Sequence, residues 1–316
     1  MKQKQDFMWA TLVHFGTNMW YDVCDKGHEA FTKLWEIPGS AEMRLDKDIW
    51  IKYMDYLKQS GINTLIIDIG DGVIYDSHPE IAIKGSWTKA DFLSELERLK
   101  NMGFNLIPKL NFSSCHDIWM KEYSRMLSTP TYYKFCEDII DEVCEMFKSP
   151  YFHIGMDEED YETQKHYSYA VIRSGELWWN DLYRIIKAVE KNGCRPIMWT
   201  DYMREHPEEF LEKCPKSVIA CNWYYMNNFD KNRSRDDEIR IRPFELLKQH
   251  GFDQFPGGSS CFSDENFNSL TQYCKKTISD EHFLGMLQTT WTMVTEPWYK
   301  TLTHAADLVA EAKKRF

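Results

Sequence analysis

The stretch TKADFLSELERLKNMGFNLIPKLNF, residues 88–112, holds a helix and a strand joined by a single glycine. Thr88 followed by Asp91 is a helix-capping pattern, and apolar residues then recur at helical spacing up to Gly103, which ends the helix. The apolar run 104–112 is too short for a typical helix and indicates a buried strand. This stretch therefore predicts a helix that returns the chain to the next strand of a parallel sheet.

The same pairing of an apolar run with a helical segment occurs along the whole chain. We predict strands at 7–15, 63–69, 104–112, 151–156, 195–200, 217–225, 252–258 and 283–291. We predict helices at 46–59, 88–103, 128–148, 174–193, 206–214, 242–250, 265–279 and 298–315. Eight such units favour one closed parallel barrel, a single (β/α)8 TIM barrel that forms one catalytic domain over residues 1–316. The first strand lacks the GxGxxG pattern of dinucleotide-binding sheets, which argues against that open fold.

The composition is that of a globular protein, with 43% hydrophobic residues and a formal net charge of −11. Such an acidic chain argues against nucleic acid or membrane partners, because anionic surfaces attract clustered Lys and Arg. No run of eighteen apolar residues occurs, and the N-terminal residues lack a signal-peptide pattern. We expect a cytoplasmic protein as the chain stands, or a periplasmic or exported one if a signal was trimmed.

The nine cysteines are widely spaced and form no CxxC pair. We expect them to be free thiols, several of them buried, in a reducing compartment. No zinc-ligand spacing appears, so we expect neither a metal nor a cofactor.

Polar and aromatic side chains follow most of the predicted strands. In a barrel of this kind the active site lies at the C-terminal ends of the strands, so these residues are the candidates for a common pocket. Carboxylates together with exposed aromatic rings are typical of sugar binding, because rings stack on sugars while acids bind hydroxyls or transfer protons. The pattern predicts a glycoside hydrolase. The candidates are His14, Asp71, Asn111, His116, Asp157, Glu158, Trp199, Asp201, Trp223, Tyr224, Tyr225, Trp291 and Glu296.

Several segments, taken in order, resemble the family 20 glycoside hydrolases, the β-N-acetylhexosaminidases. HIGMDEE at 153–159 resembles that family's HxGGDE motif at the end of the fourth strand. GINTLIIDIGDGVIYDSHPEI at 61–81 and LIPKLNFSSCH at 106–116 are similar to its second and third strand segments. RPIMWTD at 195–201 and GMLQTTW at 285–291 fall where the family's later tryptophans line the sugar pocket. The resemblance covers nearly the whole chain and implies a TIM barrel that acts on an oligosaccharide or glycoconjugate.

The resemblance also implies a mechanism, retaining exo-hydrolysis of terminal N-acetylhexosamine in which the substrate's own 2-acetamido oxygen attacks the anomeric carbon. Glu158 would be the general acid and base, and Asp157 would orient the acetamido group. These two residues must lie where the strand breaks into its loop if both are to face the sugar, because adjacent strand residues point in opposite directions. Glu159 and Asp160 are expected to be solvated charges at the start of the following loop.

Other roles implied by the resemblance stay open between alternatives. His116 and His153 would support the acid pair or be ordinary core histidines. The tyrosine that contacts the acetamido group would be Tyr224 or Tyr225.

Three positions depart from the family pattern. Met156 replaces the second glycine of the motif, LVHFGTN at 12–18 offers no arginine after the first strand, and no acid stands two residues beyond Trp291. The first strand begins within about ten residues of Met1, so we expect no smaller N-terminal domain ahead of the barrel. Two other functions therefore remain open. One is a non-catalytic glycan-binding barrel, and the other is a glycosidase for sugars lacking the 2-acetamido group, with Asp201 or Glu296 as nucleophile.

Overall fold

Eight parallel strands form the centre of the molecule in the computed structural model, which describes residues 6–22, 37–165, 167–230 and 233–316. Their order in the sheet is β8-β7-β6-β5-β2-β1-β10-β9. The two outer strands of this order approach each other through the bridges Ala220 to Gln254 and Trp223 to Gly257, which nearly close the barrel. The strands are β1 Met8–His14, β2 Thr64–Asp68, β5 Asn105–Lys109, β6 Tyr151–His153, β7 Arg195–Trp199, β8 Ile219–Cys221, β9 Gly257–Ser259 and β10 Gly285–Thr289.

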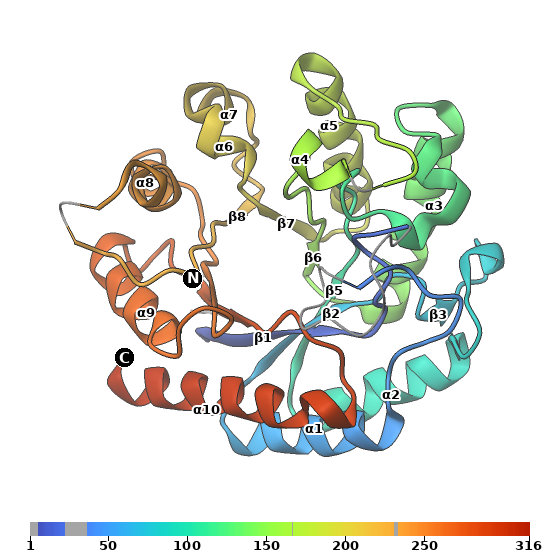
Figure 1. The fold of residues 1–316 in the computed structure, drawn as a ribbon, viewed down its shortest axis with the longest axis horizontal. Helices are drawn as coiled ribbons and strands as arrows, with labels where there is room; N and C mark the ends of the chain where they lie inside the picture. Colours follow the sequence, from blue (N-terminus) through green and yellow to red (C-terminus); the bar gives the residue numbers. More distant parts are fainter. Residues whose placement is uncertain (1–5, 23–36, 166, 231–232) are drawn as a thin grey trace.

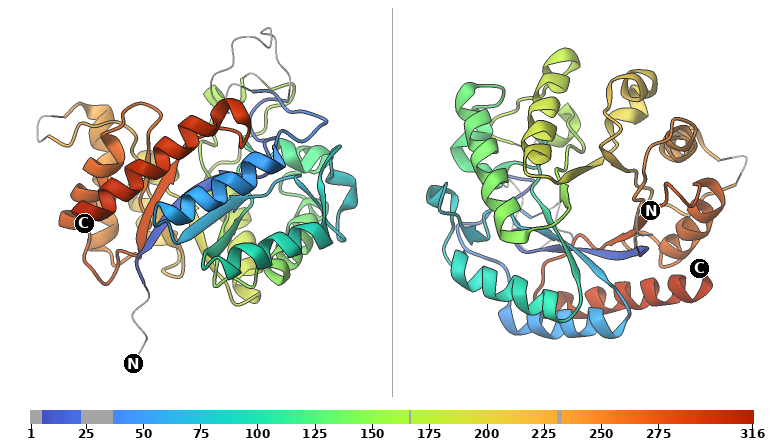
Figure 2. Two further views of the ribbon diagram at one scale, coloured as in Figure 1. Left: turned by 90° about the horizontal axis from the view of Figure 1, so that it is seen from below. Right: turned by 180° about the vertical axis from the view of Figure 1, so that it is seen from behind.

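Helices surround this barrel, and the predicted (β/α)8 TIM barrel is confirmed (Figure 1). The helices that follow the eight strands are α1 Lys47–Gln59, α2 Lys89–Asn101, α3 Pro130–Phe147, α5 Gly175–Lys191, α7 Pro207–Lys213, α8 Arg235–Gln249, α9 Asn266–Thr277 and α10 Tyr299–Arg315. The last helix, α10, packs beside α1, as the views of Figure 2 also show, and Tyr56 donates a hydrogen bond to Asp307 between them at 2.8 Å.

Short elements occupy the connections between strands and helices. They are β3 Val73–Ile74, β4 Trp87–Thr88, α4 Tyr161–Gln164, α6 Tyr202–Glu205 and the 3₁₀ helices η3 Pro79–Ile81, η4 Ile118–Arg125 and η5 Glu296–Trp298. Among the described residues, no helix is long and apolar enough to cross a membrane.

Helix α8 corrects one predicted boundary. We expected this helix over 242–250, but it begins at Arg235, where Ser234 caps it by accepting the Asp237 N–H at 3.1 Å. Pro243 lies inside this helix, although proline is more common in the first turn of a helix. The eight cysteines in the described part of the chain are free, and seven of them are buried, whereas Cys24 lies outside the described residues.

The strand period of two selects which side chains point into the barrel. An inner apolar cluster contains Leu12, Ile66 and Ile107, so the residues two positions further along, at the C-terminal end of each strand, also face inward. These end residues are His14, Asp68, Lys109, His153 and Trp199, and all five are buried. The polar layer at this end of the barrel is the floor of the candidate site.

Candidate active site

A cavity of about 580 Å³ opens above this polar layer. Asp157 and Glu158 line it together with Trp199, Trp223 and Trp291. The structure thus brings the predicted acid pair and the predicted tryptophans to one pocket.

The turn after β6 is built so that both acids reach this cavity. Gly155, Met156 and Glu158 all have positive φ, at +71°, +71° and +52°, so the chain leaves the extended conformation at once. A Cβ atom at Gly155 would lie 1.9 Å from Oδ1 of Asn111, which explains the glycine. The break expected between strand and loop is therefore present, and Met156 is held in it in a conformation that non-glycine residues rarely adopt.

Asn111 holds this turn in place. Its Oδ1 accepts the backbone N–H of Met156 at 3.1 Å, and its Nδ2 donates to Oδ1 of Asp157 at 2.7 Å. Ser113 adds a hydrogen bond from its hydroxyl to the carbonyl oxygen of Asp157 at 2.6 Å. The orientation of the Asp157 carboxylate is consequently fixed before any ligand arrives.

His116 pairs with both acids from the connection after β5. Its Nε2 lies 3.3 Å from Oδ2 of Asp157 and 3.5 Å from Oε2 of Glu158. Burial lowers the pKa of His116, but the two carboxylates outweigh burial and raise this pKa to about 10. Burial likewise raises the pKa of Asp157, but the charge and hydrogen bond of His116, with Lys109 and Asn111, hold it well below its usual value. A cationic histidine and an anionic Asp157 follow at neutral pH.

Glu158 differs from Asp157 in being accessible. Its side chain is 40% exposed, whereas that of Asp157 is 10% exposed. The ligand atoms of His116, Asp157 and Glu158 lie within 4.8 Å of one another, close enough to hold a metal ion. At neutral pH such an ion would have to displace the proton of His116, so the three groups fit proton transfer better than metal binding.

Two predicted histidines lie beneath the cavity rather than on its wall. His14 is buried with its Nδ1 3.5 Å from Asp68, which is ion-paired with Lys109, and burial lowers the pKa of His14. His153 accepts the Gly155 N–H at 3.1 Å through Nδ1, and burial together with Lys109 lowers its pKa to about 3. Both are neutral groups that support the floor of the site, and His153 also fixes the turn that carries the acids.

The aromatic side chains of the cavity stand close to one another. The ring centroid of Trp291 lies 6.2 Å from that of Trp199 and 5.8 Å from that of Trp20. Trp20 was not predicted, because it lies in the connection after β1 and follows no strand end directly. These rings leave apolar faces and edges for the apolar side of a sugar.

Asp201 lies behind Trp223 and is not one of the residues that line the cavity. It accepts the indole N–H of Trp223 at 2.9 Å and pairs with Arg204 at 2.9 Å. Burial raises the pKa of Asp201 to about 6, with Arg204 opposing and the negative charges of Asp157 and Glu158 adding to the rise. Asp201 therefore positions a tryptophan.

The sequence did not decide which of two neighbouring tyrosines, Tyr224 or Tyr225, contacts the acetamido group. The structure gives these two side chains different surroundings. The Tyr224 hydroxyl donates to Asp237 at 2.7 Å, at the N-terminal end of α8, and its ring belongs to the outer core. The Tyr225 hydroxyl instead accepts the indole N–H of Trp291 at 3.2 Å and its ring belongs to the inner cluster. Both tyrosines line the cavity, and the hydroxyl of Tyr225 contacts Trp291, another residue of its wall.

Two predicted site residues lie elsewhere. Glu296 is exposed in η5, ahead of α10, and is not among the residues that line the cavity. Asp71 is buried beside Asn18, which donates to it at 2.6 Å, and it lines a separate small pocket with Lys121. Neither is placed to touch a ligand bound between Asp157 and Trp291.

Asp71 gives a testable dependence of stability on pH. Burial raises its pKa to about 7, so it stabilises the fold when protonated, below about pH 4, and this contribution is lost as pH rises through 7. We expect Asp71→Asn to be more stable than wild type at pH 8, with a difference that shrinks by on the order of 3 kcal/mol towards pH 4. Urea unfolding across this range measures it, with Asp55→Asn on the exposed face of α1 as control. A difference that stays constant with pH would contradict the prediction.

Glu159 is not a solvated charge, contrary to expectation, whereas Asp160 is exposed as expected. Arg173 donates to both carboxylate oxygens of Glu159 at 2.8 Å, and the two side chains are 1% and 5% exposed. Asp160 caps α4 by accepting the Thr163 N–H at 2.8 Å. The partner of Glu159 lies fourteen positions away in an irregular connection, so no local pattern of the sequence indicated the pair.

Comparison with known proteins places this geometry in a family. No curated protein matches the sequence. Similar solved structures include a β-N-acetylhexosaminidase from Bacteroides fragilis NCTC 9343, with 14% identity and a TM-score of 0.62 over 96% of this chain and 65% of that chain. The GH20 β-N-acetylhexosaminidase from Streptomyces coelicolor A3(2) shares 13% identity with a TM-score of 0.62, over 96% and 64% of the two chains. A GH20 exo β-N-acetylglucosaminidase from Vibrio harveyi shares 14% identity with a TM-score of 0.60, over 97% and 55%.

At these identities the structural likeness shows the fold alone, and this chain spans 55% to 65% of the length of those three chains. The sequence itself carries the assignment. The model of the family described as glycosyl hydrolase family 20, catalytic domain, matches residues 97–301, which include Asn111, His116, Asp157 and Glu158. Because this match covers more than half of the chain, the protein belongs to glycosyl hydrolase family 20.

Proposed function

We propose that residues 1–316 form one catalytic barrel that acts as a retaining exo-β-N-acetylhexosaminidase on oligosaccharides or glycoconjugates. The observation that carries this proposal is the unequal acid pair. Asp157 is buried, anionic and fixed by His116 and Asn111, whereas Glu158 beside it is 40% exposed. Two adjacent carboxylates with such different environments suit two different roles.

In the proposed reaction Glu158 protonates the glycosidic oxygen while the carbonyl oxygen of the substrate's acetamido group attacks the anomeric carbon. The bond to the leaving group breaks, and a cyclic oxazolinium intermediate forms. Asp157 accepts the acetamido N–H and stabilises the positive charge that develops there. Glu158, now a carboxylate, removes a proton from the water that opens the ring, and the anomeric configuration is retained.

The alternative mechanism, a glycosidase that uses a carboxylate of the protein as nucleophile, fits the geometry less well. Asp201 is engaged by Trp223 and Arg204, and Glu296 is exposed in η5, so neither offers a free carboxylate at the cavity. A non-catalytic glycan-binding barrel would use the same cavity, and activity separates it from the enzyme.

The test compares 4-nitrophenyl N-acetyl-β-D-glucosaminide and galactosaminide with the corresponding β-glucoside. We expect hydrolysis of the acetamido substrates and competitive inhibition by a thiazoline analogue of the oxazolinium ion. Hydrolysis of the glucoside at a similar rate would contradict substrate assistance. If calorimetry shows that the thiazoline binds but neither acetamido substrate turns over, the glycan-binding alternative holds.

Tyr225→Phe separates the two tyrosines by experiment. The Tyr225 oxygen accepts the indole N–H of Trp291, and we propose that its own proton is donated to the acetamido carbonyl oxygen of the substrate. Loss of this donor should lower kcat for the glucosaminide by about 10- to 100-fold with little change in KM, as expected for a contact strongest in the transition state. Tyr224→Phe is the matched control and should lose about 1 kcal/mol of stability, because its bond to Asp237 is structural. Equal kinetic losses in the two variants would contradict the assignment.

A further inference from the structure

Two cysteine side chains lie in contact at the end of the barrel opposite the catalytic cavity. Cys144 belongs to the last turn of α3, and Cys194 lies in the turn between α5 and β7. Both are free thiols, and their Sγ atoms are 3.7 Å apart. Each residue is 6% exposed, and Glu145 and Gly193 beside them are exposed, so the pair lies just beneath the surface.

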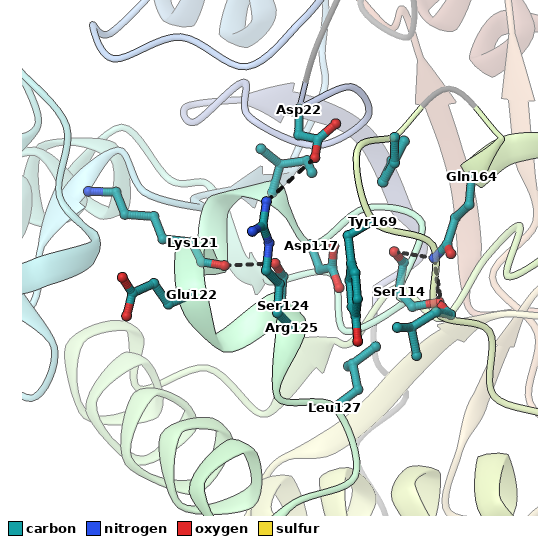
Figure 3. A pocket seen from close by; sticks show the side chains of 13 residues that line it. Asp22, Ser114, Asp117, Lys121, Glu122, Ser124, Arg125, Leu127, Gln164 and Tyr169 are labelled. Carbon is teal, nitrogen blue, oxygen red and sulfur yellow. Dashed lines mark hydrogen bonds and ion pairs between the residues drawn. The ribbon is translucent and has the colours of Figure 1, made fainter.

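The position of the two cysteines separates them from any ligand. Cys194 directly precedes β7, whereas Trp199 at the other end of this strand lines the catalytic cavity. Another pocket, of about 390 Å³, has Asp117 and Gln164 in its wall and is formed by connections that follow β5 and β6 (Figure 3). Both pockets thus belong to the C-terminal ends of the strands, and a bond between the two sulfur atoms touches neither.

Contacts other than the thiols hold α3 and the end of α5 together. Asp141, one turn before the cysteine of α3, accepts hydrogen bonds from Lys191 at 2.8 Å and from Asn192 at 2.6 Å. The thiol of Cys194 donates to the carbonyl oxygen of Ser149 at 3.0 Å, just ahead of β6. The fold itself therefore keeps the two sulfur atoms side by side.

The two thiols differ in acidity. The hydrogen bond with Cys144 lowers the pKa of Cys194, and burial opposes this effect. The same hydrogen bond raises the pKa of Cys144, and burial adds to the rise. Because the thiolate is the form that attacks a disulfide, Cys194 is the thiol that reacts first.

We propose that Cys144 and Cys194 form a reversible disulfide when the protein meets a small disulfide such as oxidised glutathione. The thiolate of Cys194 attacks one sulfur of the small disulfide, and the other sulfur leaves as a thiolate and takes up a proton. Cys144 then loses its proton and attacks the Cys194 sulfur of the mixed disulfide, so that the second small thiolate leaves. Two protein thiols are oxidised to one disulfide, and the small disulfide is reduced to two thiols.

The new bond closes a loop of chain that carries the acid pair of the candidate active site. Residues 144–194 include β6, Asp157, Glu158 and α5. A cross-link between the ends of such a loop lowers the conformational entropy of the unfolded chain and so stabilises the fold. The disulfide therefore stabilises the unit that holds the acids without contacting them, and this inference does not depend on the proposed function.

The experiment treats wild type with oxidised glutathione under native conditions, blocks the remaining thiols with iodoacetamide and digests the protein without reduction. Mass spectrometry should find the peptides of Cys144 and Cys194 joined, and dithiothreitol should separate them. Circular dichroism should show a melting temperature about 5 °C higher for the oxidised than for the reduced protein.

Variants assign this difference to the pair. Cys144→Ser and Cys194→Ser should each lose the difference between oxidised and reduced protein. Any loss of stability from the substitution itself cancels, because each variant is compared with its own reduced form. Cys261→Ser is the matched control and should keep the difference, since Cys261 is the only described cysteine that is not buried and follows β9.

Three results would overturn the inference. One is glutathione attached to Cys144 or Cys194 with no link between the two. Another is a wild-type protein in which both thiols remain reduced after prolonged exposure to the oxidant. The third is a linked pair with an unchanged melting temperature, which would reject the stabilising role of the bond.

Discussion

Glu158→Gln is expected to lower kcat for 4-nitrophenyl N-acetyl-β-D-glucosaminide by about 10³-fold. The amide keeps the size of the side chain but neither gives up nor takes up the proton at the glycosidic oxygen. Glu158 is 40% exposed and lies 3.5 Å from His116, so the substitution should leave the fold unchanged. KM should change little, since the lost interaction belongs to the transition state.

The leaving group provides the sharper readout. The 2,4-dinitrophenolate leaving group departs with little protonic assistance. With a 2,4-dinitrophenyl glycoside, Glu158→Gln should therefore slow formation of the intermediate much less than it does with the 4-nitrophenyl or an alkyl glycoside. Glu208→Gln, an exposed acid on α7, is the matched control for removal of one carboxylate. An unchanged rate, or the same loss for every leaving group, would show that Glu158 is not the general acid.

The barrel could be predicted because its units repeat. Eight apolar runs are each followed by a segment with apolar residues at helical spacing. These patterns specify the strands and helices without any knowledge of their tertiary contacts. The shifted start of α8 shows the limit of such patterns. Pro243 has the sequence properties of a helix start, and only the hydrogen bond from Asp237 to Ser234 shows where the helix begins.

The site could be predicted where strand alternation decides it. Trp199 ends a strand, and its inward direction follows from the period of two. Asp71 comes three residues after β2, beyond a glycine turn, and there the alternation no longer applies. Glu159 was misjudged for another reason, since the burial of an acid depends on a cation that only the folded chain brings to it.

That cation, Arg173, joins two acids beneath the catalytic turn. Besides its two bonds to Glu159 it donates to Asp181 at 3.0 Å and to the carbonyl oxygen of Phe112 at 2.7 Å. Glu159 in turn accepts the Ser114 N–H at 3.2 Å. The guanidinium thus ties the connection that carries His116 to the connection that carries Glu158, with every partner side chain nearly inaccessible to water.

Arg173→Met should therefore destabilise the protein by about 3 to 5 kcal/mol, because it leaves two buried carboxylates without their cation. The melting temperature should fall by roughly 6 °C or more, measured by circular dichroism, with Arg235→Met, an exposed arginine at the start of α8, as control. Arg173→Met combined with Glu159→Gln should regain part of the loss, since one of the uncompensated charges is gone. If Arg173→Met has the same melting temperature as wild type, the ion pairs of Arg173 with Glu159 and Asp181 contribute nothing to stability. If the double variant is no more stable than Arg173→Met, the lost stability comes from packing of the arginine stem rather than from buried charge.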